Sequence, residues 1–110
     1  METVRFESKT QEFRSHKETE REETLRFHFD ERVRRAQAAL QGFQAAFDNG
    51  NHPVDLLYHR ITDVDHDEHE VKVTVKYGFK DSGRFDDPYS GRVDVLVIAV
   101  TEHEGAPTPY

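Results

Sequence analysis

The sequence predicts an α+β fold, in which an antiparallel sheet of about four strands packs on one amphipathic helix. Several segments alternate apolar and polar residues, the pattern of strands with one buried face. One segment instead spaces its apolar residues by three and four, as on one face of a helix. The 110 residues are enough for one domain. We therefore expect the order β-α-β-β-β over residues 24–104, with a charged arm before it and a flexible tail over 105–110.

Residues 1–23 form the predicted charged arm. Val4 and Phe6 alternate with charged residues, which indicates a short strand. Residues 8–23 then contain a single large apolar residue, Phe13, among mixed acids and bases. Such a segment either stays solvated or forms a helix held by salt bridges.

A strand is predicted over residues 24–29, in which three apolar residues share one face: Leu25, Phe27 and Phe29. A competing interpretation makes this segment part of one long helix that begins near Ser15, because Leu25 and Phe29 also lie at helical spacing from Val33. Phe27 would point away from the apolar stripe of that helix. The sequence leaves both interpretations open.

The helix is the clearest periodic segment of the chain. Its apolar residues follow one another at steps of three, four, three and four, at Val33, Ala36, Leu40, Phe43 and Phe47. Asp30 is suited to cap its start, and Asn49-Gly50 followed by Pro53 ends it near Asp48.

Three further strands are predicted over residues 55–64, 70–79 and 92–102. The second has an apolar face made by Val71, Val73, Val75, Tyr77 and Phe79. The third is apolar on both faces between Val95 and Val100, as expected of a central strand or of one covered by a partner subunit.

One helix covers only one face of a sheet, so the third strand needs a second cover. We therefore expect the chain to self-associate, with the interface at Val95, Leu96, Val97, Ile98 and Val100. The number of subunits stays open.

The charge of the chain restricts its other partners. The formal net charge of -7 argues against binding to nucleic acids or to anionic membranes. Cysteine is absent, which excludes disulfides and thiolate chemistry. The first residues are charged and lead into no apolar segment, so no secretory signal is visible and we expect a cytoplasmic protein.

The segment over residues 63–70 is the best candidate for a metal site. Its carboxylates and imidazoles are of the types that ligate divalent ions: Asp63, Asp65, His66, Asp67 and His69. The three aspartates match the first ligands of an EF-hand loop, but Glu68 stands where that loop needs glycine and Thr74 where it needs glutamate. The alternative is a solvated turn between two strands.

No residue pattern points to catalysis. The serines lie in no strained elbow flanked by glycines, and no glycine-rich phosphate loop is present. We expect a protein without enzymatic activity, whose seven histidines make it sensitive to pH. The loop over residues 81–91, with Phe85 and Tyr89, is a candidate contact surface.

Residues 24–80 resemble the dodecins, small flavin-binding proteins that assemble as dodecamers. The resemblance is carried by the predicted strand, helix, strand, strand order and by Gly78-Phe79 at the end of an amphipathic strand. It implies that Tyr58 stands where the family has the tryptophan that stacks on flavin, and Lys72 where it has a flavin-contacting glutamine.

The sequence thus leads to one principal hypothesis and two alternatives. The first is a non-catalytic oligomeric protein that binds a partner or assembles with itself, without a cofactor. The second is a dodecin-like protein that binds flavin or another small molecule. The third is a protein with a divalent metal in the hairpin over residues 63–70.

Overall fold

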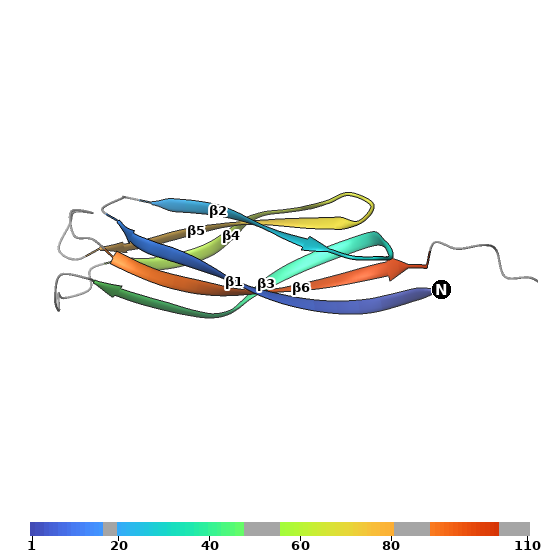
Figure 1. Cartoon of the computed structure of the whole chain (residues 1–110), viewed down its shortest axis with the longest axis horizontal. Coiled ribbons are helices and arrows are strands. Elements are labelled where there is room, and N and C mark those ends of the chain that lie inside the picture. The colour runs from blue at the N-terminus through green and yellow to red at the C-terminus, as the bar shows by residue number, and fades with distance from the viewer. Residues whose placement is uncertain (17–19, 48–55, 81–88, 104–110) are drawn as a thin grey trace, which may run out of the picture.

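The structure, a computed structural model, describes residues 1–16, 20–47, 56–80 and 89–103, and in these ranges it is all-β. Six strands follow one another along the chain: β1 (Glu2–His16), β2 (Arg21–His28), β3 (Arg32–Phe47), β4 (Leu56–His66), β5 (Glu70–Lys80) and β6 (Tyr89–Glu102). They form two antiparallel sheets, sheet A in the order β1-β6-β3 and sheet B in the order β2-β5-β4 (Figure 1). The predicted α+β fold is therefore wrong.

The two sheets lie face to face and make an elongated sandwich. The Cα trace extends over 67 × 17 × 17 Å, because the strands all run along the same long axis. The hairpin between β4 and β5, together with the turn between β2 and β3, lies toward the end where the chain begins (Figure 1).

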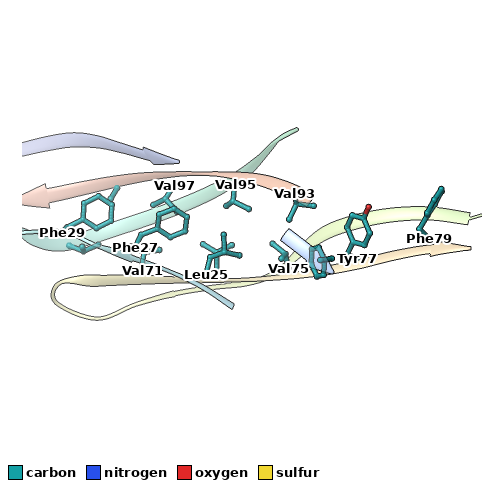
Figure 2. Packing of buried hydrophobic residues seen from close by; sticks show 14 of the residues in the cluster. Leu25, Phe27, Phe29, Val71, Val75, Tyr77, Phe79, Val93, Val95 and Val97 are labelled. Carbon is teal, nitrogen blue, oxygen red and sulfur yellow. The ribbon is translucent and has the colours of Figure 1, made fainter. Parts of the chain in front are cut away.

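The core lies between the sheets and is built from alternate residues of each strand. Figure 2 shows Leu25 and Phe27 of sheet B pointing toward Val95 and Val97 of sheet A. The predicted apolar face of β5 is confirmed, since its five side chains are buried: Val71, Val73, Val75, Tyr77 and Phe79. In both sheets the central strand, β5 or β6, supplies the most deeply buried residues.

The predicted helix is strand β3, and two β-bulges explain the error. In the pairing of β3 with β6, one extra residue lies between Val33 and Arg35 and another between Leu40 and Gly42. A step of four residues is two strand periods, and a step of three is one strand period plus one bulged residue. Both steps therefore leave the apolar residues of β3 paired with core residues of β6, although the Phe43 side chain remains 50% exposed. The same steps of three and four are the spacing of one face of a helix.

The segment expected to be a charged arm, with a short strand followed by a solvated or helical part, is largely strand β1. It pairs with β6 from Glu2 opposite Glu102 to His16 opposite Tyr89. Phe13, the one large apolar residue of residues 8–23, is buried, and its ring stacks on that of Tyr77 at 4.6 Å. The strand predicted over residues 24–29 is confirmed as part of β2, and the competing long helix is wrong.

Strand β6 has β1 on one side and β3 on the other, which confirms that it is a central strand. The strand, helix, strand, strand order implied by the resemblance to dodecins is not found, because β3 takes the place of the helix.

Candidate docking surface

The outer face of sheet A has an apolar patch at one end of the sandwich. Leu96, Ile98 and Val100 of β6 alternate with core residues and therefore point away from the core. The pairing of β1 with β6 places Val4 beside Val100 and Phe6 beside Ile98. We call these five residues the apolar patch.

The exposure of the patch is greatest on the edge strand. Phe6 exposes 64% of its surface and Val4 exposes 53%, whereas the three residues of β6 are half-buried between their neighbours. A phenylalanine that is mostly exposed to water, beside four aliphatic side chains, is the kind of surface that marks a protein contact.

Polar residues surround the patch. At its outer end, Arg35 lies 3.9 Å from Glu2 and Arg34 lies 3.3 Å from Glu102. Toward the middle of the sheet, Ser8 on β1 donates a hydrogen bond of 2.8 Å across β6 to Gln41 on β3. An apolar centre with a polar rim is typical of interfaces between proteins.

The surface beside the patch is hollowed next to β3. This hollow has a volume of about 500 Å³ and is lined by Arg35, Ala36, Gln37, His66, Ile98 and Val100. Ile98 and Val100 belong to the patch as well, so the exposed ring of Phe6 and the hollow lie on opposite sides of β6.

The outer face of sheet B is different in chemistry. Its central strand presents Lys72, Thr74 and Lys76. Charged neighbours pair there, with Arg26 2.9 Å from Glu70 and Lys76 3.8 Å from Glu22. Such a face is stable in water, so only sheet A offers an apolar outer surface among the described residues.

The five residues predicted as an interface divide between two faces of β6. Val95 and Val97 are fully buried in the core of the chain itself, whereas Leu96, Ile98 and Val100 belong to the apolar patch. Sequence reasoning missed the contribution of Val4 and Phe6 to this surface. Their alternation indicated a strand, but it carried no information on which strand they pair with.

The predicted metal ligands are spread along the β4–β5 hairpin. Asp63 and Asp65 lie opposite Thr74 and Lys72 on the outer face of sheet B. Asp67 closes the turn, since its Oδ1 accepts hydrogen bonds from the backbone N–H groups of His69 and Glu70 at 2.9 and 2.8 Å.

These two bonds lower the pKa of Asp67. His69 instead has its Nδ1 3.1 Å from the carbonyl oxygen of Phe29, and His66 lies beside the hollow on sheet A. Within the described ranges no three such side chains gather around a common point as metal ligands would.

Tyr58 and Lys72, the residues implied by the dodecin resemblance, do not lie together. Tyr58 is opposite Gly78 on β5, six residues from Lys72, which corresponds to about 20 Å along a strand. The hydroxyl of Tyr58 donates to Glu20, and burial together with that carboxylate raises its pKa.

Two other predictions cannot be placed in the same way. Most of the loop over residues 81–91 and the whole tail over 105–110 lie outside the described residues. In the described ranges there is also no helix with the length and apolarity needed to span a bilayer.

Comparison of this chain with family models, with curated proteins and with solved structures finds no match. The residues and geometry of the chain itself therefore carry the functional argument.

Proposed function

We propose that this protein is a non-catalytic assembly protein, which binds further copies of itself through the outer face of sheet A. The observation that carries the proposal is the apolar patch, in which Phe6 and Val4 are largely exposed beside the half-buried aliphatic residues of β6. The proposal assigns no reaction and no cofactor to the chain, and places it in the cytoplasm, which cell fractionation would test.

The size of this face supports the proposal. Three strands with the 14-residue length of β6 present a surface of about 650 Å². Stable interfaces between proteins bury about 800 Å² on each partner, so the contact must involve the whole outer face of sheet A and not the apolar patch alone.

The distribution of charge supports contact through the strands. The six strands contain thirteen of the fifteen basic residues but only ten of the twenty-two acidic ones. The acidic excess therefore lies in the connections and ends, such as Asp30 and Glu31 in one turn and Asp67 and Glu68 in another. Like charges at the ends of the sandwich oppose end-to-end contact.

Substitution of Phe6 by glutamate tests the proposal. A charge in the patch should reduce the mass measured by sedimentation toward the 12.9 kDa of one chain. Because Phe6 is on an edge strand and mostly exposed, the fold should tolerate the change. Thr24→Glu, exposed on the edge strand of sheet B, is the matched control and should leave the mass unchanged. An equal effect of both substitutions, or of neither, would contradict the proposal.

A further inference from the structure

Phe6 and the hollow lie on opposite sides of β6. Phe6 projects from β1, whereas the hollow of about 500 Å³ lies on the β3 side of β6. Each chain therefore has an exposed ring at one edge of sheet A and a hollow at the other edge. In a complex of two copies, the ring of each copy meets the hollow of the other.

The register of sheet A places Phe6 and the hollow at the same position along the strand axis. Phe6 on β1 and Gln37 on β3 both pair with Ile98, and Val4 and Arg35 both pair with Val100. A second copy whose strands run in the same direction therefore places its Phe6 over Gln37 and the hollow.

We infer that copies of this chain associate about an axis parallel to their strands, so that Phe6 of one copy enters the hollow at the β3 edge of the next, which is lined by β3, β6 and His66 of β4. This inference rests on the proposed function, and it adds which residues meet. An aromatic ring seated in a pocket is the typical centre of a strong protein contact.

Charge favours the same arrangement. Strand β3 contains Arg32, Arg34 and Arg35 and no acidic residue. Glu2 on β1 and Arg32 on β3 both pair with Glu102, so in the inferred arrangement the Glu2 carboxylate of one copy approaches the arginines of the next. Oppositely charged groups across an interface fix the relative orientation of the partners.

The crossed arrangement, with the axis perpendicular to the strands, fits less well. If it is centred on Ile98, it places Phe6 over Phe6 and leaves the hollow facing another hollow.

The substitution Gln37→Trp distinguishes the inferred contact from nonspecific hydrophobic association. The new indole lies over the hollow of its own chain, so Phe6 of the next copy should be excluded, although the face has become more apolar. We expect association to weaken roughly 30-fold, the factor that corresponds to about 2 kcal/mol for an aromatic anchor. Thr24→Trp adds the same ring to sheet B and should have no such effect. Stronger association of the Gln37→Trp variant would overturn the inference.

Cross-linking tests the direction of the strands directly, because the chain has no cysteine of its own. Ser8 and Ala39 both pair with Leu96, so Ser8→Cys and Ala39→Cys copies, when mixed, should be joined by a short bismaleimide. Gln37→Cys copies alone should not be joined. If Gln37→Cys copies are joined and the mixed Ser8→Cys and Ala39→Cys copies are not, in a protein that sediments as an oligomer, the inference is overturned and the proposed function still holds. A wild-type monomer would overturn both.

Discussion

At the scale of single residues, two glycines of the sandwich make room for aromatic rings in different ways. The hydroxyl of Tyr77 occupies the space beside Gly91 and donates a hydrogen bond of 2.5 Å to the carbonyl oxygen of Gln44. Gly78 lies under the ring of Tyr58 on the outer face of sheet B. The ring of Tyr77 is fully buried and stacks on Phe13, whereas the ring of Tyr58 is only partly buried.

We predict that Gly91→Ala destabilises the protein strongly. The added Cβ would lie well inside 3.0 Å of both the Tyr77 hydroxyl and the Gln44 carbonyl oxygen, and the backbone cannot move aside. The expected loss is about 3 kcal/mol or more in the free energy of unfolding, measured by chemical denaturation. Gly78→Ala is the control, with a smaller loss because only the Tyr58 side chain must move. Equal losses would show that this account of Gly91 is wrong.

His59 makes the stability depend on pH. Its ring packs on Phe43 at 4.0 Å, and its buried Nδ1 has no hydrogen-bond partner among the described residues. Burial lowers the pKa of His59 below its ordinary 6.5, so the folded state binds fewer protons than the unfolded state. The free energy of unfolding should therefore decrease as the pH falls through 6.5 toward the lowered pKa.

His59→Phe keeps a ring on Phe43 and removes the titrating group. We predict that the free energy of unfolding of the variant, relative to that of the wild type, is higher at about pH 5.5 than at about pH 7.5. Chemical denaturation at both pH values measures this difference. If the difference in stability between the two proteins does not change with pH, His59 is not the responsible group.

At the scale of elements, the sequence allowed β2, β5 and β6 to be predicted, because their core residues recur with period two. Strand β4 was predicted as well, although a bulge at Thr62 interrupts its alternation. The sequence did not allow β3 to be predicted, since bulges at Arg34 and Gln41 convert a strand pattern into helical spacing. The five alanines of this strand favour a helix locally, and its pairing with β6 outweighs that preference.

The location of the apolar patch could be predicted only in part. Leu96, Ile98 and Val100 were found because both faces of their strand are apolar. Val4 and Phe6 belong to the patch through a pairing between the two ends of the chain, from Glu2 opposite Glu102 onward. No local pattern in the sequence encodes a contact over so large a separation.

A substitution in β3 distinguishes a strand from a helix. Ala46 is exposed and lies opposite Ser90. We predict that Ala46→Thr leaves the free energy of unfolding unchanged or raises it by a few tenths of a kcal/mol, because threonine favours strands. In an exposed helix the same change costs about 0.5 kcal/mol. A loss of that size in thermal or chemical denaturation would contradict the assignment of β3.

At the scale of the whole molecule, an elongated sandwich with one polar and one partly apolar outer face follows from these elements. The outer face of sheet B carries paired charges and can face water. The turn of its β4–β5 hairpin is closed by Asp67. Sheet A has a projecting ring, a hollow and an arginine-rich edge strand on its outer side. We therefore predict that copies of the chain associate through sheet A.

The most direct test is the mass of the wild-type protein in solution, measured by sedimentation at micromolar concentration. We predict a defined multiple of 12.9 kDa, with solvent protection of Phe6 and Ile98 that is absent at high dilution. A single chain of 12.9 kDa at every concentration, with Phe6 freely exposed, would contradict this prediction.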